Sequence, residues 1–154
     1  MTTFVIFFFL AVYNAGCMTA LQLQHYAIYP LVGRESFANY MRANNRAAAV
    51  PTIVPAMLLL ISTIVLAIDR PAFIHATEMA IAVALNFLAL ASTILWQRRL
   101  QAEMAVSGYD EQKVRRLIGT NWIRTVAHLL LALLATGIVA RVVSSAAMGP
   151  VHSL

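Results

Sequence analysis

Residues 123–143 read IRTVAHLLLALLATGIVARVV, an apolar stretch that carries an arginine and a histidine near its beginning. About 20 apolar residues are enough to cross the hydrocarbon core of a bilayer as a helix. An arginine inside such a span costs roughly 2.5 to 3.5 kcal/mol to insert, so ionisable groups there often mark functional sites. The stretch therefore predicts a membrane helix and a candidate site around Arg124 and His128.

The rest of the chain has the composition of an integral membrane protein. Of its 154 residues, 61% are hydrophobic and 11% are charged, whereas soluble proteins have about 25% charged residues. Four stretches approach or reach the length of a membrane span: residues 3–21, 47–68, 79–96 and 123–143. The connections between them are short, so we expect residues 1–154 to form a single all-α domain, an integral membrane four-helix bundle.

Basic residues are distributed unevenly among the connections, and this sets the expected orientation. The first and third connections hold most of them: Arg34, Arg42, Arg46, Arg98, Arg99, Lys113, Arg115 and Arg116. By the positive-inside rule these connections face the cytoplasm, which places both chain ends outside it. We expect a multi-pass protein of the bacterial inner membrane. The net charge of +5 then reflects contact with membrane lipids and not with nucleic acid, because the cations flank the spans without interleaved aromatic residues.

The first stretch is expected to remain as a span, because it lacks the basic start of a cleaved signal peptide. Its lone Cys17 is expected to be buried as a small apolar residue. Helical spacing then continues beyond the span until Pro30 or Gly33 interrupts it. The residues that share one face of this extension are Gln22, His25, Tyr26 and Tyr29.

A short amphipathic helix is predicted between spans one and two. Ser36 is its expected N-cap, and we expect the helix to lie at the cytoplasmic interface. One side of it holds Phe37, Tyr40, Met41 and Asn44. Pro51 suits the first turn of the second span, whereas Pro55 is expected to leave a kink.

The third connection is predicted to be a helix, a turn and the start of the long fourth helix. Gly108 lies in the turn, and Asp110 and Glu111 follow at the helix N-terminus. The fourth helix therefore begins outside the membrane. Glu78, at the start of the third span, is expected to mark the opposite interface, and Asn86 is expected to make an interhelical hydrogen bond.

On this topology, polar residues of all four helices meet in the cytoplasmic leaflet. His128 lies about 10 Å deeper than Asn121 at 1.5 Å per residue, which gives the group the depth of a pocket. The residues expected to react are His25, Arg124 and His128. Those expected to bind a ligand are Tyr26, Tyr40, Asn44, Arg46, Asn121, Trp122 and Thr125, with Gln97 nearby.

A structural interpretation of the same residues stays open. Arg124 can extend its guanidinium to the headgroup layer, and Asn121 and Thr125 can bond neighbouring helices. His128 can be a neutral packing residue. These side chains would then stabilise the bundle without binding a ligand.

The histidine positions argue against a metal site. Of four histidines, His75 falls on the outer side and His152 in the C-terminal tail. Only His25 and His128 can approach each other, and no paired cysteines or carboxylate accompany them, so no metal is expected. A b-type haem held by these two residues is the alternative. Catalytic triads, phosphate loops and dinucleotide fingerprints are absent from the sequence.

The chain resembles the anthrone-oxygenase-like family of small four-helix bacterial membrane proteins, most of which have no assigned function. The similarity covers the whole chain. It departs from the family near Tyr40, where bacterial members carry histidine and this chain has Met41 and Asn44. The matching residues are Gln24-His25-Tyr26, the series Phe37, Tyr40, Asn44 and Arg46, and Thr120-Asn121-Trp122-Ile123-Arg124-Thr125.

The resemblance implies a cofactor-independent oxygenase acting on an aromatic or quinol-like molecule. His25 or His128 would abstract a proton, and Arg124 would stabilise the oxyanion. Asn121 and Tyr26 would orient the ring. A pocket that binds, and in this interpretation oxidises, a small amphiphilic aromatic molecule or quinone is the first expectation. A non-catalytic accessory subunit of a larger membrane complex, or a homo-oligomer, is the alternative. Lipid or quinone binding by Arg124 and Arg46 is a third.

Overall fold

The computed structural model of the protein describes residues 1–147, and these contain helices and no strands. His152 and the rest of the C-terminal tail lie outside the described residues. Four helical runs are each long and apolar enough to cross a membrane: Thr2–Leu31, Ala49–Ile68, Ala76–Ser107 and Glu111–Ala147. The predicted all-α membrane bundle is confirmed, and the four runs indicate a multi-pass membrane protein.

The first run is longer than its apolar stretch, as the helical spacing predicted. Helix α1 (Thr2–Ala20) continues through the π-helical segment η1 (Leu21–His25) and the 3-10 segment η2 (Tyr26–Leu31). The run ends beside Pro30, whose ring cannot continue an α-helix. The predicted face is confirmed, because Gln22, Tyr26 and Tyr29 are buried and His25 is half-buried.

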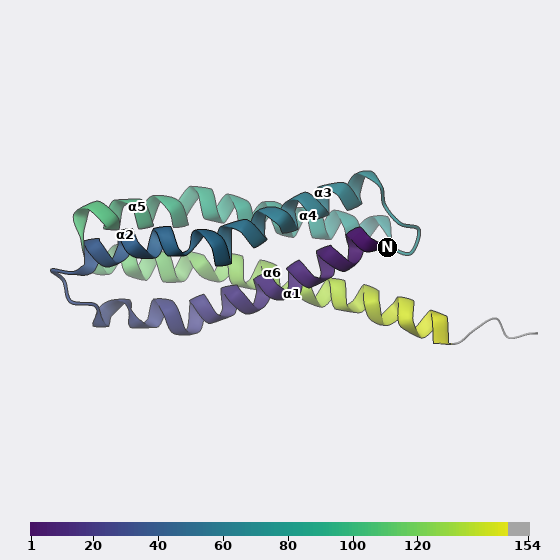
Figure 1. Cartoon of the computed structure of the whole chain (residues 1–154), viewed down its shortest axis with the longest axis horizontal. Coiled ribbons are helices and arrows are strands. Elements are labelled where there is room, and N and C mark those ends of the chain that lie inside the picture. The colour runs from purple at the N-terminus through teal and green to yellow at the C-terminus, as the bar shows by residue number, and fades with distance from the viewer. Residues whose placement is uncertain (148–154) are drawn as a thin grey trace, which may run out of the picture.

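The predicted short helix is α2 (Phe37–Ala47), and it is amphipathic as expected, with Phe37 and Met41 buried. Ser36 occupies the N-cap position as predicted, but its side chain makes no capping hydrogen bond. Figure 1 shows α2 running along the bundle beside α5 and leading into the second span. The apolar side of α2 therefore packs on another helix of the same chain.

Two prolines shape the start of the second span. A π-helical segment, η3 (Ala49–Ile53), precedes α3 (Val54–Ile68). Pro55 has no N–H group, so the Pro51 carbonyl has no donor four residues later in its own helix. The hydroxyl of Tyr13 on α1 donates to that carbonyl at 3.0 Å, and the half-buried Cys17 thiol approaches it at 3.7 Å. The break that Pro55 introduces is thus stabilised from α1.

The second half of the chain is a helical hairpin. It comprises α4 (Ala76–Ser92), the π-helical segment η4 (Thr93–Gln97), α5 (Arg98–Ser107) and the long α6 (Glu111–Ala147). Gly108 makes the turn with φ of 81°, a conformation that glycine adopts without steric cost. Asp110 Oδ1 accepts a hydrogen bond from the Lys113 N–H at 3.1 Å, which confirms its place at the helix N-terminus.

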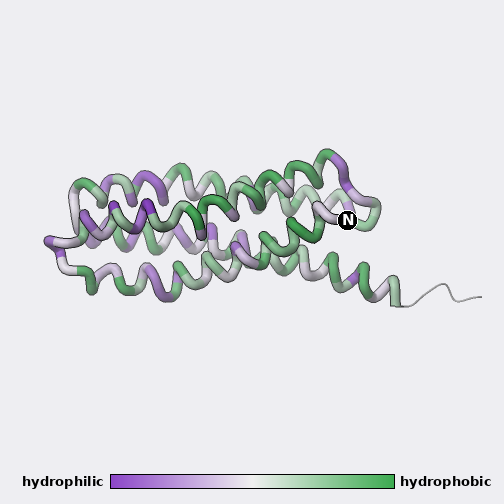
Figure 2. Tube along the Cα trace, in the orientation of Figure 1, coloured by the Kyte–Doolittle hydropathy of each residue, from purple (hydrophilic) through white to green (hydrophobic). Residues whose placement is uncertain are grey.

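The helices run side by side, with α1 and α4 both packed against α6 and α3 completing the bundle. In Figure 1 the N-terminus and the connection between α3 and α4 lie at one end of the bundle. The other two connections lie at the opposite end, where Figure 2 shows more hydrophilic residues. We call these the chain-start end and the connection end.

Two apolar clusters fill the bundle. The first lies toward the chain-start end and contains Phe4, Phe7, Leu10, Ala11, Leu59, Leu66, Ile74, Met79, Ala82, Leu131, Ala135 and Ile138. The second, the aromatic cluster, lies toward the connection end and contains Tyr26, Tyr29, Phe37, Met41, Leu100, Met104, Ala105, Val114 and Leu117. Along the first run and α6, buried polar residues lie between the two clusters: Asn14, Gln22, Asn121, Arg124, Thr125 and His128. We call this group the polar layer.

Two polar residues of α4 bind neighbouring helices. Asn86 donates to the Thr63 hydroxyl on α3 at 2.9 Å, which confirms the expected interhelical hydrogen bond. Glu78 accepts from the His75 N–H at 2.8 Å and also pairs with Arg141 of α6, with Nη2 and Oε2 2.9 Å apart. The ion pair was not predicted, and it ties α4 to α6 at the chain-start end.

Candidate functional site

The guanidinium of Arg124 lies inside the bundle. The residue is 9% exposed, and its Nη2 donates to the thioether sulfur of Met18 on α1 at 2.9 Å. No ion pair of Arg124 is found within residues 1–147. A thioether is a weak acceptor, and the other guanidinium N–H groups of Arg124 have no hydrogen-bond partner within residues 1–147. Of the two interpretations of Arg124, the interior position is the one observed.

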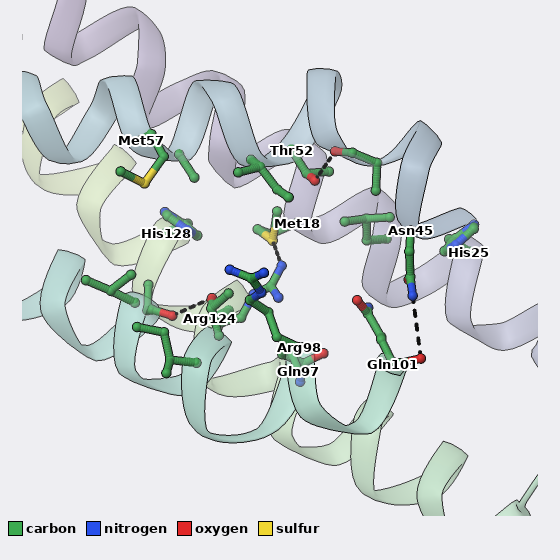
Figure 3. A pocket seen from close by; sticks show the side chains of 18 of the residues that line it. Met18, His25, Asn45, Thr52, Met57, Gln97, Arg98, Gln101, Arg124 and His128 are labelled. Carbon is green, nitrogen blue, oxygen red and sulfur yellow. Dashed lines mark hydrogen bonds between the residues drawn. The ribbon is translucent and has the colours of Figure 1, made fainter. Parts of the chain in front are cut away.

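His128 lies one helical turn beyond Arg124 and is 5% exposed. Its Nδ1 is buried and has no hydrogen-bond partner among the described residues. Figure 3 shows the imidazole and the Arg124 guanidinium directed into the same cavity. A buried polar atom without a partner is uncommon in native proteins and calls for an explanation, and a bound molecule is one.

The cavity has a volume of about 530 Å³. This volume is within the range of small-molecule sites, about 300 to 1,000 Å³. Its apolar walls come chiefly from α3 and α4, and polar side chains surround the rest. The apolar lining includes Ile53, Met57, Leu60, Leu90 and Ile94, and the polar lining includes His25, Asn44, Asn45, Gln97, Arg98, Gln101, Arg124 and His128.

All three π-helical segments contribute to this cavity. Leu21 and His25 come from η1, Thr52 and Ile53 from η3, and Thr93, Ile94 and Gln97 from η4. A π-helical turn inserts extra backbone into a helix and is frequent at functional sites. Three of the four runs depart from regular α-helix at one level, the level at which the bundle is hollow.

The cavity opens on the side of the bundle. Three large apolar residues that line it are also about half exposed, namely Ile53 at 51%, Met57 at 46% and Ile94 at 58%. They belong to η3, α3 and η4, so the opening lies between the second and third runs. All three residues belong to runs that can cross a membrane, and exposed apolar side chains of a membrane span face the lipid tails.

The structure brings five of the predicted site residues to the cavity: His25, Tyr26, Asn44, Arg124 and His128. Figure 3 shows how those that it labels face the cavity. The other five predicted residues do not line it. Three of these lie within the bundle, and two point away from it.

Asn121 and Thr125 hold α1 against α6. Asn121 Nδ2 donates to Oε1 of Gln22 at 2.8 Å, and the Thr125 hydroxyl donates to the Met18 carbonyl at 3.5 Å. Because Met18 also contacts Arg124, these bonds fix the helix pair that positions the guanidinium. The expectation that they bond neighbouring helices is confirmed, and neither touches the cavity.

Tyr40 packs against the aromatic cluster and contacts the cavity residue His25 without lining the cavity itself. The two rings stack with centroids 6.4 Å apart. Burial raises the pKa of Tyr40, so its hydroxyl stays protonated at neutral pH. His25 Nε2 is 3.3 Å from the Tyr29 hydroxyl, which also accepts from Asn44 Nδ2 at 3.3 Å. One imidazole nitrogen of His25 is therefore already engaged, and the haem alternative stays a prediction.

Arg46 and Trp122 face away from the cavity. Arg46 is exposed, and Trp122 is 46% exposed. The reason is rotation about the helix axis, since successive residues are about 100° apart. Each of the two residues lies two positions from a cavity residue, Asn44 and Arg124 respectively, and therefore points nearly the opposite way. Neither residue lines the cavity, and a role of either in ligand binding stays a prediction.

Sequence analysis missed several lining residues of the third run, above all Arg98 and Gln101. Arg98 was counted only among the cations of the cytoplasmic face. The sequence could have indicated this lining face. Leu90, Ile94, Gln97 and Gln101 are spaced as on one side of a helix that continues from the apolar span into the polar connection. Arg98 stands beside Gln97 on that face.

The chain matches no protein-family model, and no curated protein or solved structure is detectably similar to it. The resemblance to the anthrone-oxygenase-like family stays a prediction. Function is therefore argued from the chemistry of the site. Among residues 1–147, no group of three His, Cys, Asp or Glu side chains is placed to hold a metal ion.

Proposed function

We propose that the cavity around Arg124 and His128 binds a small amphiphilic aromatic or quinol-like molecule that reaches it from the membrane. The observation that carries this proposal is the buried guanidinium of Arg124, whose one hydrogen bond within residues 1–147 goes to a thioether. Removing a cation from water costs several kcal/mol unless acceptors replace the water. The oxygen of a ligand would supply these acceptors.

The distribution of polarity in the cavity matches an amphiphile. The oxygen would lie at Arg124 and His128, where the donors and the free imidazole nitrogen are. The ring would pack on Met57, Leu60 and Leu90, which form an apolar wall. Small-molecule sites commonly combine apolar walls with a few polar groups that orient the ligand.

Access from the lipid follows from the exposed rim residues Ile53, Met57 and Ile94. An apolar molecule partitions into the membrane, and an opening toward the lipid tails lets it enter without crossing water. Entry from the lipid also explains why the apolar wall lies on α3 and α4, next to the opening, whereas Arg124 and His128 lie on α6.

We also propose that the connection end faces the cytoplasm of a bacterial cell and that both chain ends lie outside it. Eight of the eleven Lys and Arg residues are near the connection end, whereas Arg70 and Arg141 lie at the chain-start end. Basic residues flanking spans are retained on the cytoplasmic side. The cavity would then lie in the cytoplasmic leaflet of the inner membrane.

The family resemblance supplies a reaction for this site, oxidation of an anthrone-like ring carbon by dioxygen without a bound cofactor. His128 would take a proton from the carbon, since its Nδ1 has no partner among the described residues, and Arg124 would stabilise the resulting oxyanion. The carbon loses both its hydrogens. One oxygen atom becomes its carbonyl, and the other leaves as water after accepting two protons.

An assembly role is the second candidate. Gly16 and Ala20 lie one turn apart on α1, and both are exposed on the outer surface of the bundle. Small residues at this spacing let a second membrane helix approach closely. The protein would then be a subunit of a larger membrane complex or a homo-oligomer, and the polar layer would stabilise the fold.

Native mass spectrometry of protein released gently from its own membrane tests both candidates. We expect an added small mass that Arg124→Gln and His128→Phe each lose, whereas Arg115→Gln keeps it. Arg115 is the matched control because it is exposed and paired with Glu111. Added masses of whole protein chains, with no small molecule in any variant, would instead support the assembly role and reject the binding site.

A further inference from the structure

We propose that the bound molecule is an anion, an aromatic carboxylate or an ionised phenol, whose charged oxygens lie between Arg124 and Arg98. This inference rests on the proposed function and names the class of ligand. It assigns a binding role to Arg98, a residue at the start of α5. Figure 3 shows the Arg98 and Arg124 side chains extending into the cavity from two different helices.

The first support is the charge of the cavity lining. Arg98 and Arg124 line it, and no Asp or Glu side chain of residues 1–147 does so. The acidic residues in ion pairs serve other cations: Glu78 pairs with Arg141, Glu103 with Arg99 and Lys113, and Glu111 with Arg115. The cavity therefore holds two positive charges that the described part of the chain leaves without counter-ions.

The second support is the contrast between Arg98 and its neighbour Arg99. Arg99 points outward, with a side chain 78% exposed, and its Nε is 3.0 Å from Oε1 of Glu103. Arg98 is exposed as well, but it makes no ion pair and no side-chain hydrogen bond within residues 1–147, and it lines the cavity together with Arg124. The two adjacent arginines thus leave the helix about 100° apart, and of the two only Arg98, at the cavity, has no acidic partner within residues 1–147.

The third support is the chemistry of guanidinium groups. Their planar arrays of N–H donors match the two oxygens of a carboxylate, and such charge-assisted bonds are about twice as strong as neutral ones. Two cations that line one cavity repel each other, and an anion between them converts that repulsion into attraction. A neutral quinone carbonyl would accept hydrogen bonds but would leave both charges uncompensated.

Binding of two fluorescent probes of nearly equal shape tests the inference. Anthracene-2-carboxylate carries the charge, and anthracene-2-carboxamide is its neutral counterpart. The protein is placed in nanodiscs of a zwitterionic phospholipid, so that the lipid surface does not concentrate the anion. We expect the carboxylate to bind at least tenfold more tightly than the carboxamide. We also expect Arg98→Gln to abolish most of this difference.

Two variants control this experiment. Arg99→Gln removes the same charge from the same helix but outside the cavity, so we expect it to keep the tenfold preference. Arg98→Lys keeps the charge without the fork of donors, and we expect it to retain part of the preference. A loss of preference in Arg99→Gln equal to that in Arg98→Gln would show a general effect of net charge and would overturn the role of Arg98.

The outcomes separate this inference from the proposed function. Equal affinity for both probes, with binding still weakened by Arg124→Gln, would overturn the anionic ligand and leave the binding site standing. No binding of either probe would overturn both. Displacement of the carboxylate by added phosphatidylglycerol, at amounts where phosphatidylcholine has no effect, would assign the anion to a phospholipid headgroup and reject the aromatic ligand.

Discussion

At the scale of single residues, the position of Arg124 depends on hydrogen bonds made by its neighbours. Asn121 and Thr125, three residues before it and one after, bond to α1 through Gln22 and Met18. The resulting register presents the Arg124 guanidinium to the cavity and Trp122 to the outside. Residues without ligand contact can therefore affect binding through the packing of α1 on α6.

We predict that Asn121→Ala lowers the free energy of unfolding by about 1 kcal/mol. The change removes a buried interhelical hydrogen bond and leaves Oε1 of Gln22 without its donor, a loss typically near this size in membrane proteins. Reversible unfolding in mixed micelles of increasing SDS content measures it. Trp122→Phe is the control, since that side chain faces outward. A double variant with Gln22→Ala whose cost equals the sum of both single costs would disprove the coupling.

At the scale of elements, the regular α-helices are interrupted at the level of the cavity, and the chain reverses direction at the turn around Gly108. The π-helical segments η1, η3 and η4 surround the cavity. Pro51 and Pro55 account for the irregularity of η3, because neither ring nitrogen can donate a hydrogen bond. No proline or glycine lies within η1 or η4, so packing against neighbouring helices decides those two departures.

Two glycines of the helical hairpin give opposite predictions. Gly108 has φ of 81° and ψ of −157° in the turn, a backbone region that is essentially restricted to glycine, so Gly108→Ala should destabilise the protein by about 1 to 3 kcal/mol. Gly119 lies within α6, exposed and with no atom within 4 Å of an added Cβ, so Gly119→Ala should stabilise it by about 0.5 to 1 kcal/mol. The same SDS titration measures both. Changes of the same sign would contradict the assigned backbone conformations.

At the scale of the whole molecule, the polar layer separates two apolar clusters that differ in the segments surrounding them. The cluster toward the chain-start end is surrounded by apolar spans, whereas the aromatic cluster lies among the basic connections. This arrangement suits a bundle whose connection end extends beyond the bilayer into water. The cavity then lies at the boundary, where an amphiphile can keep its ring in lipid and its oxygen near the polar end.

The proposed orientation predicts which connections an impermeant thiol reagent reaches. In a Cys17→Ser background, we expect Ala72→Cys to react in intact spheroplasts and Ser107→Cys to react only after the membrane is opened. Both positions are exposed, one in each type of connection. Labelling of Ser107→Cys in intact spheroplasts, with Ala72→Cys protected, would contradict the proposed orientation and indicate the opposite one.

Local features of the sequence were sufficient to predict the four helical runs, one buried face and the turn at Gly108. Apolar length indicates the four runs, because a helix in lipid must satisfy its own backbone hydrogen bonds. Helical spacing placed Gln22, Tyr26 and Tyr29 on one buried face, and Gly108 marked the turn. These properties depend on residues close together in the chain, and the structure confirms each of them.

The membership of the cavity, in contrast, was decided by the tertiary structure. Arg46 and Trp122 were expected in it and lie outside, whereas Arg98, which was counted only among the cations of the third connection, lines it. The cause is the rotation of each helix about its axis, which depends on side-chain packing between helices distant in sequence. A difference of two residues along a helix turns a side chain to the opposite side. The sequence alone therefore determined which helices carry the polar groups, and packing determined which of those groups face one another.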